Sequence, residues 1–302
     1  MTGFQGVHAA AITPRGKQGE IDFGAAFDLV DHLCKGGVRG IVLFGDYGEY
    51  PSFTVEERSR LTYLAVKRSR VPVLVGVGSA TMDLSVSLAR DARDAGAAAV
   101  LIPPPLFYHY EPDDLVEFYH RIASQLGSSI DAFLSNTPHS ASSFTVDTAL
   151  PLLQTGHFAG IEDASGNLES FASFEAAAAG NFRLLVSNDA LFTRVRCGSG
   201  GAHGAISSTA CVVPELVVAL DRAIASSKSD QVSALDGALQ EFLRWEALFP
   251  KPVLVKVATG LRGLKTGNAS VPLCRGKERL LNEFCEWFQG WLQAVRKMSA
   301  NA

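Results

Sequence analysis

The chain has 302 residues, of which 47% are hydrophobic and 19% charged, and its formal net charge is −4. This composition is ordinary for a soluble globular protein and provides material for a large core. The mild negative charge argues against a nucleic-acid partner and against an anionic membrane surface. Because no apolar run approaches about 20 residues, we expect no membrane-spanning helix.

The N-terminus and the cysteines point to the cytoplasm. Residues 1–5 show no basic segment leading into an apolar one, so no secretory signal is expected. The five cysteines are scattered without a CxxC pair, which fits buried thiols in a reducing compartment. We therefore predict a cytoplasmic protein without a disulfide framework or a zinc site.

Short apolar runs alternate with amphipathic segments from residue 7 to about residue 226. Nearly continuous apolar runs are typical of strands that are covered on both faces. We predict eight such strands at residues 7–12, 40–44, 71–77, 98–102, 130–134, 157–161, 183–186 and 202–207. Between them, Thr54 and Glu57 have the spacing of a capping box, and Pro112 suits the first turn of a helix.

Eight strand–helix units in succession predict a closed (β/α)₈ TIM barrel, which we place at residues 1–226. An open doubly wound sheet is the alternative, but no GxGxxG follows the first strand. Residues 227–302 have a different pattern, with helices expected at 227–249, 252–261 and 277–298. Trp245, Trp287 and Trp291 give these helices apolar faces. We interpret this part as a C-terminal helical extension.

In such barrels the carboxyl ends of the strands and the loops after them build the functional site. Here these positions carry many acids and hydroxyls, one histidine, and no lysine or arginine. They are Thr13 and residues 45–49, 76–79, 103–108, 135–139, 162–166, 187–189 and 207–208. A small-molecule ligand is the partner that such a mouth predicts.

Several motifs in this order resemble the dihydrodipicolinate synthase / N-acetylneuraminate lyase family. They are residues 11–14 (AITP), 45–49 (GDYGE), 71–73 (VPV) running into 76–78 (GVG), 136–138 (NTP), 160–166 (GIEDASG) and 204–207 (GAIS) followed by Pro214. Each motif is weak alone, but together they cover most of the chain. The resemblance implies the barrel, the helical extension and a homo-oligomer, either a dimer or a tetramer of tight dimers.

The departures from the family pattern bear on chemistry. Members of the family form a Schiff base between a lysine on the sixth strand and a 2-keto acid, and this position holds Glu162. The family's proton-relaying tyrosine corresponds to Ser135. The paired hydroxyl residues after the second strand correspond to Asp46 and Tyr47, and the second aromatic of a Pro-Tyr-Tyr motif corresponds to Phe107.

These replacements predict that no pyruvate imine forms, because an imine needs an uncharged amine and a carboxylate cannot supply it. Two acids would also repel a 2-keto-acid anion in a site of reduced dielectric. Lys256 lies in a family-like surround, but we expect its helix not to reach the mouth. No cofactor is expected.

We predict Glu162, Asp46 and Ser135 as catalytic residues, with Glu162 and Asp46 as acid and base if their proximity raises one pKa. His139 with these acids is a conceivable site for a divalent cation, although its spacing matches no established metal motif, and we predict no metal. The predicted ligand-binding residues are Tyr47, Phe107, Asn136, His139, Ser187 and Ile206.

Two interpretations of function stay open. One is an enzyme of altered mechanism, a lyase or hydratase that acts on a neutral or cationic small molecule. The other is a non-catalytic member that binds a small molecule, or that regulates or scaffolds a related enzyme. Converging polar groups with a raised carboxyl pKa favour the first, and a mouth filled by Tyr47, Phe107 or Leu106 favours the second.

Overall fold

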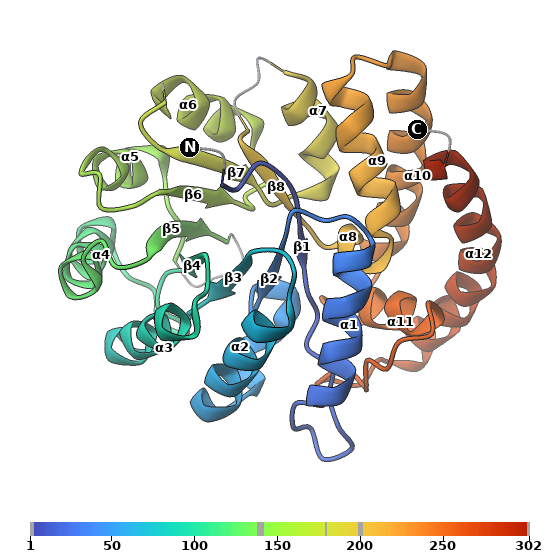
Figure 1. The fold of residues 1–302 in the computed structure, drawn as a ribbon, viewed down its shortest axis with the longest axis horizontal. Coiled ribbons are helices and arrows are strands. Elements are labelled where there is room, and N and C mark those ends of the chain that lie inside the picture. Colours follow the sequence, from blue (N-terminus) through green and yellow to red (C-terminus); the bar gives the residue numbers. More distant parts are fainter. Residues whose placement is uncertain (1–2, 138–141, 179, 199–201, 301–302) are drawn as a thin grey trace.

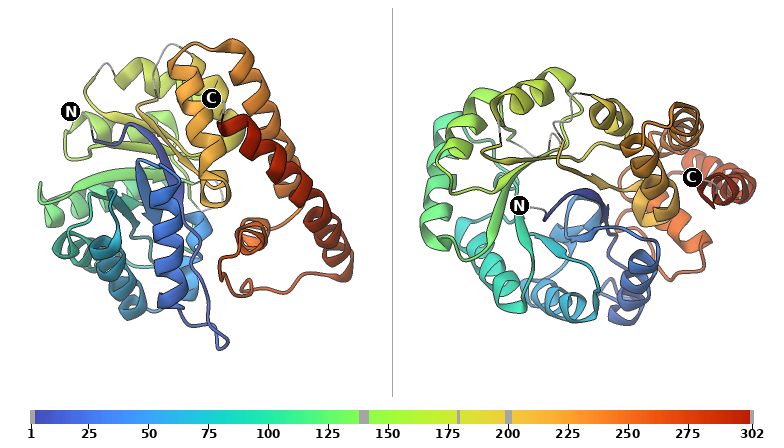
Figure 2. Two further views of the ribbon diagram at one scale, coloured as in Figure 1. Left: turned by 45° about the vertical axis from the view of Figure 1, so that its right-hand side comes forward. Right: turned by 45° about the horizontal axis from the view of Figure 1, so that its top comes forward.

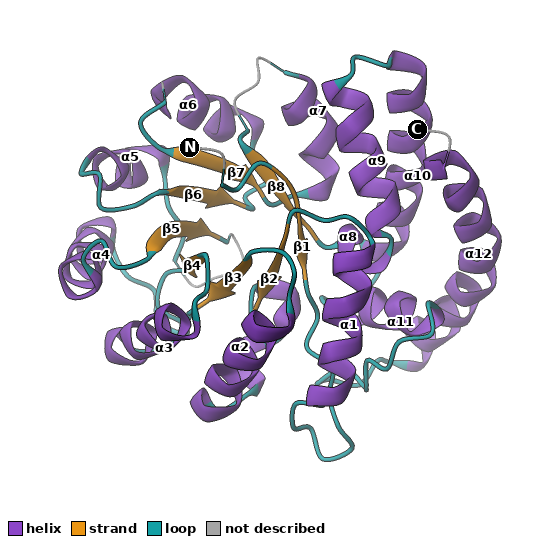
Figure 3. Cartoon of the chain, viewed as in Figure 1, coloured by secondary structure: helices purple, strands orange, loops and turns teal. Residues whose placement is uncertain are grey.

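The computed structural model describes residues 3–137, 142–178, 180–198 and 202–300. Eight parallel strands follow one another around a closed barrel, and the last pairs with the first. They are β1 (Gly6–Ala10), β2 (Gly40–Leu43), β3 (Val73–Gly76), β4 (Ala99–Ile102), β5 (Asp131–Asn136), β6 (Gly160–Asp163), β7 (Arg183–Val186) and β8 (Gly204–Ser207). Helices surround these strands (Figures 1 and 3). The predicted (β/α)₈ TIM barrel is confirmed.

The helices around the barrel begin at the signals that the sequence carries. Thr54 and Glu57 form a capping box at the start of α2, and Pro112 is the first residue of α4. The helices are α1 (Phe23–Lys35), α2 (Val55–Arg68), α3 (Met82–Ala95), α4 (Pro112–Leu126), α5 (Val146–Gln154), α6 (Leu168–Ala178), α7 (Phe192–Cys197), α8 (Thr209–Val212) and α9 (Pro214–Ala225). Short 3₁₀ turns are η1 (Asp46–Gly48), η2 (Tyr50–Ser52) and η3 (Asp189–Leu191).

Apolar side chains fill the inside of the barrel, so the interior is a packed core rather than a pore. This interior cluster consists of Ala10, Val42, Leu74, Ala99, Leu101, Phe133, Leu185 and Ile206. The much larger outer core lies between the strands and the helices. Any site must therefore lie at an end of the barrel, above this apolar floor.

The C-terminal extension consists of α10 (Ser229–Glu246), α11 (Val253–Leu261) and α12 (Arg275–Ala300), outside the ring of barrel helices on one side (Figure 2). Trp291 is 6% exposed and stacks on Phe242 at 5.5 Å between ring centroids. Because α9 leads away from the strand carboxyl ends and α10 returns, the C-terminal end of α10 approaches the barrel mouth. The extension is thus placed to contribute to the site.

The cysteines differ in exposure from our prediction of buried thiols. Only Cys211 is buried, while Cys34 and Cys285 are half-buried and Cys197 and Cys274 are exposed. The two exposed residues lie at the last position of α7 and immediately before α12, where the chain meets solvent. All five are free thiols.

No helix in the described ranges has both the length and the apolarity needed to cross a membrane.

A buried arginine fixes the end of β3, and its removal should be costly. Arg58 of α2 is 5% exposed and donates to the carbonyls of Gly76 at 3.0 Å and Gly78 at 2.9 Å. Its guanidinium also lies 5.1 Å from the Tyr50 ring centroid. Arg58→Met leaves two backbone acceptors without these donors, so we expect the unfolding free energy to fall by about 3 kcal/mol in urea denaturation.

The matched control is Arg60→Met, on the same helix but exposed. Arg60 lies over the Phe23 ring, an exposed contact for which a loss below about 1 kcal/mol is expected. Equal losses in the two variants would show that the carbonyls after β3 find other partners.

Candidate active site

Four of the residues predicted in the loops after the fifth and sixth strands, Ser135, Asn136, Glu162 and Asp163, are the last residues of the strands themselves. Ser135 of β5 pairs in register with Glu162 of β6, and both residues lie within their strands. Side chains alternate along a strand, and Phe133 and Leu185 belong to the barrel interior. Ser135 and Ser187, each two residues further on, therefore share the inward face with Glu162. These three side chains form the base of the mouth.

Glu162 is a buried carboxyl, 6% exposed, that accepts hydrogen bonds from two hydroxyls. Ser135 Oγ donates to Glu162 Oε2 at 2.7 Å, and the Ser187 hydroxyl donates as well. Burial raises the pKa of Glu162 to about 7, while the two serine bonds oppose this rise and the charges of Asp46 and Asp163 add to it. Burial, rather than the approach of Asp46, is thus the main cause.

The side chains of Asn136 and Asp163 point away from the barrel interior and form hydrogen bonds with the segments that follow β5 and β6. Asn136 Nδ2 donates to Asp163 Oδ1 at 2.8 Å, and Asn136 Oδ1 accepts the Phe144 backbone N–H at 3.1 Å. Asp163 Oδ2 accepts from Ser165 Oγ at 3.0 Å, and burial raises the Asp163 pKa. In the structure the Asn136 amide therefore serves the backbone and Asp163, not the base of the mouth.

Asp46 lies in η1 after β2 and meets a lysine from the extension. Lys251 Nζ is 3.5 Å from Asp46 Oδ2 and 5.0 Å from the centroid of the Tyr47 ring. Tyr47 Oη in turn donates to Glu246 Oε1 at 2.5 Å. The strand-end set has no cation of its own, but the extension supplies one beside it.

Glu246, the last residue of α10, is a second carboxyl whose pKa is raised to about 7. Burial is the largest cause, and the Asp189 charge raises the pKa further, whereas the Tyr47 bond, Lys251 and Ser208 lower it. Asp189 Oδ2 accepts from Ser208 Oγ at 3.1 Å and from a backbone N–H. Its Oδ1 is buried and has no hydrogen-bond donor within the described ranges.

The other predicted ligand residues lie in different surroundings. Phe107 follows β4 and is 82% exposed with its ring against Tyr108, so it does not fill the mouth. Ile206 is part of the apolar floor. His139 lies outside the described residues, so its metal and ligand roles stay hypotheses. In the part of the chain that the structure describes, no three His, Cys, Asp or Glu side chains gather as metal ligands would.

Lys256 reaches further than the sequence suggested. It is 2% exposed in α11, and its ammonium pairs with Glu49 in the segment after β2 and donates to the Asn268 carbonyl at 3.3 Å. We predicted that this helix does not reach the mouth, whereas Lys256 contacts Glu49, one of the residues that follow β2. Burial lowers the Lys256 pKa and the Glu49 partner opposes this, so the amine is held in an ion pair.

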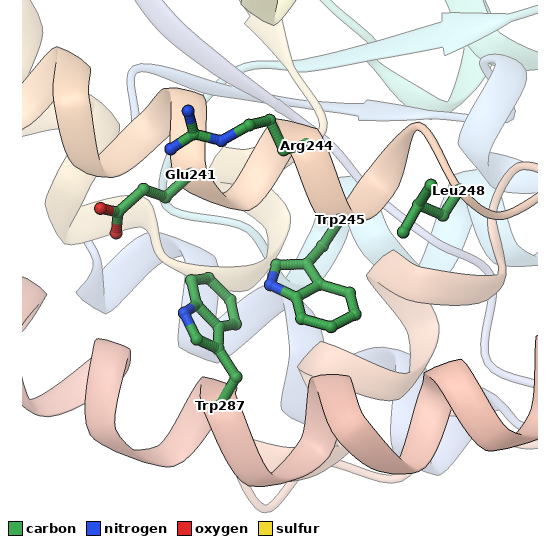
Figure 4. A pocket seen from close by; sticks show the side chains of 5 residues that line it. All are labelled: Glu241, Arg244, Trp245, Leu248 and Trp287. Carbon is green, nitrogen blue, oxygen red and sulfur yellow. The ribbon is translucent and has the colours of Figure 1, made fainter.

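Two hollows in the surface lie away from this mouth. One of about 310 Å³ lies between α10 and α12, lined by Glu241, Arg244, Trp245, Leu248 and Trp287. Figure 4 shows the two indoles side by side, Trp245 from α10 and Trp287 from α12. The other, of about 430 Å³, lies at the opposite end of the barrel.

Sequence reasoning missed Glu246 and Lys251 because both lie in the extension, far along the chain from every strand. One signal was present in the sequence. A glutamate in the last turn of a helix interacts unfavourably with the helix dipole, so a stabilising contact of Glu246 with another part of the fold was to be expected. Tyr47 provides it, since its hydroxyl donates to the Glu246 carboxylate.

Comparison with known proteins identifies the family of this chain. The chain matches the Dihydrodipicolinate synthetase family over residues 3–288. It belongs to that family. The 4-hydroxy-tetrahydrodipicolinate synthases of Methanothrix thermoacetophila and Bacillus subtilis are similar to it. They are 30% and 28% identical, over 89% of this chain in both cases and over 91% and 93% of the relatives.

Solved structures share the fold over nearly the whole chain. The 4-hydroxy-tetrahydrodipicolinate synthase of Methylacidiphilum fumariolicum is 26% identical with a TM-score of 0.88, covering 98% of this chain and 99% of that one. The Ruminococcus gnavus sialic acid aldolase, at 22% identity, has a TM-score of 0.86 over 97% and 99%. The second likeness concerns the fold alone.

Proposed function

We propose that this family member is an acid–base enzyme, a lyase or hydratase, in which Glu162 transfers a proton to or from a small molecule. The supporting observation is a carboxyl buried at the base of the mouth, oriented by Ser135 and Ser187, with a pKa of about 7. A group with this pKa is present in both protonation states near neutral pH, which general acid–base catalysis requires. Asp46 and Ser135 act with it.

The charges around the mouth favour a neutral or cationic substrate. Lys251 balances Asp46, but Asp189 and Asp163 have no paired cation among the contacts described above. The buried Asp189 Oδ1 also needs a donor, and a hydroxyl or ammonium group of a substrate would supply one. A 2-keto-acid anion would meet these carboxylates instead.

The ordinary synthase reaction is, in this proposal, lost. The relatives are named as synthases, whereas the position of the family's Schiff-base lysine holds Glu162 and that of its tyrosine holds Ser135. We propose that the protein works without a cofactor, in the cytoplasm, as a homo-oligomer (dimer or tetramer).

A second candidate is a non-catalytic small-molecule-binding or regulatory member. One observation favours it, because Tyr47 packs against the interior cluster and is held there by Glu246. A side chain fixed over the floor of the mouth reduces the room for a reacting molecule.

A ligand screen tests the proposed substrate class. We expect polyhydroxylated neutral and amine-bearing metabolites to raise the melting temperature of the wild type, and 2-keto acids to leave it unchanged. Asp189→Asn should remove the shift, whereas Glu241→Gln, a change of equal charge at an exposed site on α10, should retain it. Stabilisation by 2-keto acids alone would contradict the proposal, and a ligand that binds but is never converted would favour the second candidate.

A further inference from the structure

The hollow at the amino-terminal end of the barrel is rich in arginine. It has a volume of about 430 Å³, and its wall includes Arg39, Arg70, Arg222 and one acid, Asp221. Arg39 directly precedes β2 and Arg70 lies shortly before β3, while Arg222 is in the last turns of α9. The topology therefore brings three cations to one place, at the end of the barrel opposite to the mouth.

The single acid in the hollow is already neutralised. Asp221 Oδ1 accepts from Arg196 Nε at 2.9 Å and from Arg196 Nη2 at 2.7 Å, so this pair is charge-balanced without the other arginines. Within the described ranges, no salt bridge of the structure pairs the exposed guanidinium groups of Arg39, Arg70 and Arg222, and the acid that the charge of Arg70 acts on, Asp31, is already paired with Arg68. The wall of the hollow thus includes three exposed arginines and no acid that is free to balance them.

The rest of the wall is apolar. It is formed by Val7, Val38, Val71, Pro72 and Val218 beside Gly37, and of the five apolar residues Pro72 is the exposed one. Gly37, whose φ is +82°, has no side chain between its backbone and Arg222. A Cβ added at Gly37 would lie 4.0 Å from Arg222 Nη2, so the guanidinium group lies close to the Gly37 backbone. The positive charges of Arg39, Arg70 and Arg222 repel one another in this hollow. Planar guanidinium groups also match the geometry of phosphate oxygens. This combination of charge and lining suits a ligand with an anionic and an apolar part.

We propose that this hollow binds a small organic phosphate with two or more phosphate groups. The phosphates accept from Arg39, Arg70 and Arg222, and the organic part covers the apolar wall around Pro72. This site is independent of the proposed function, since no residue of the mouth contributes to it.

Binding of ADP and of inorganic pyrophosphate to the full chain, measured by titration calorimetry, tests the proposal. We expect both to bind, ADP more tightly because of the apolar wall, with affinity that falls as salt increases. Each of Arg39→Gln, Arg70→Gln and Arg222→Gln should weaken binding by about 10-fold or more. Arg244→Gln, an equal change of charge at the other hollow, should leave it unaltered.

Melting temperatures without ligand separate a binding role from a structural one. Removing one of three repelling charges should leave the melting temperature of each variant unchanged or higher, as for residues kept for function at a cost in stability. A lower melting temperature in all three variants would assign the arginines to structure and overturn the proposal. Affinity lost equally in Arg244→Gln, or absent in the wild type, would overturn it as well.

Discussion

Glu162→Gln is expected to lower the turnover of any substrate found for this protein by about 100-fold or more, the usual contribution of a general acid or base. The amide is nearly the same size as the carboxyl, so the hydrogen bond from Ser135 can persist while proton transfer cannot. The wild-type rate should change with pH around 7, where the Glu162 pKa lies, and this inflection should be absent from the residual activity of the variant.

The same substitution should change how stability depends on pH, which can be measured without a substrate. The folded pKa of about 7 lies above the ordinary value of 4.5, so the folded state holds the proton more tightly than the unfolded one. Stability therefore falls as pH rises from about 4.5 to about 7, by about 3 kcal/mol in total, and stays lower above that. Glu162→Gln should remove this part of the dependence of stability on pH.

Glu246 contributes a slope of the same sign, since its pKa is also raised to about 7. Denaturation at pH 5 and pH 8 should therefore show Glu162→Gln and Glu246→Gln each flattening part of the dependence. The exposed Glu241→Gln should follow the wild type. If Glu162→Gln kept the full wild-type slope and full turnover, Glu162 would have no role as a titrating group and the acid–base proposal would fail.

The sequence predicted the barrel because its strands are short, apolar and regularly spaced. Period-two alternation also explains the base of the mouth, since Phe133 and Leu185 point inward and the serines two residues later must do the same. The error in strand bounds was small but informative. Polar residues such as Ser135 and Glu162 looked like loop residues, whereas hydrogen bonding between them allows the strands to continue to their ends.

The contribution of the extension could not be predicted in the same way. Which end of α10 meets the mouth depends on the packing of α9 and α10, and no local pattern encodes it. Lys251 beside Asp46 and Glu246 beside Tyr47 are contacts across about two hundred residues of sequence. Such pairs follow only from the folded topology, and they alter the charge that a ligand meets.

Wild-type protein treated with pyruvate and borohydride should show no added mass, whereas Glu162→Lys should gain a reduced adduct. In the variant the amine attacks the keto carbon and water leaves, and hydride then reduces the C=N bond to a stable secondary amine. Burial at this position favours the uncharged amine that the attack needs, while Asp46 and Asp163 oppose it. We therefore expect partial labelling that increases with pH, read by intact-protein mass.

The controls locate the reactive amine. Lys251 is the lysine nearest to Asp46, so Glu162→Lys should also be tested with Lys251→Met, and labelling should persist in the double variant. A wild-type adduct that disappears in Lys251→Met would place a working amine in the extension, and Lys256 would be next if it persisted. Either wild-type adduct would contradict the proposed loss of imine chemistry. Labelling confined to the lysine introduced at position 162 would instead show that an amine at this position is sufficient for imine formation, and that the wild type forms no imine because Glu162 stands there.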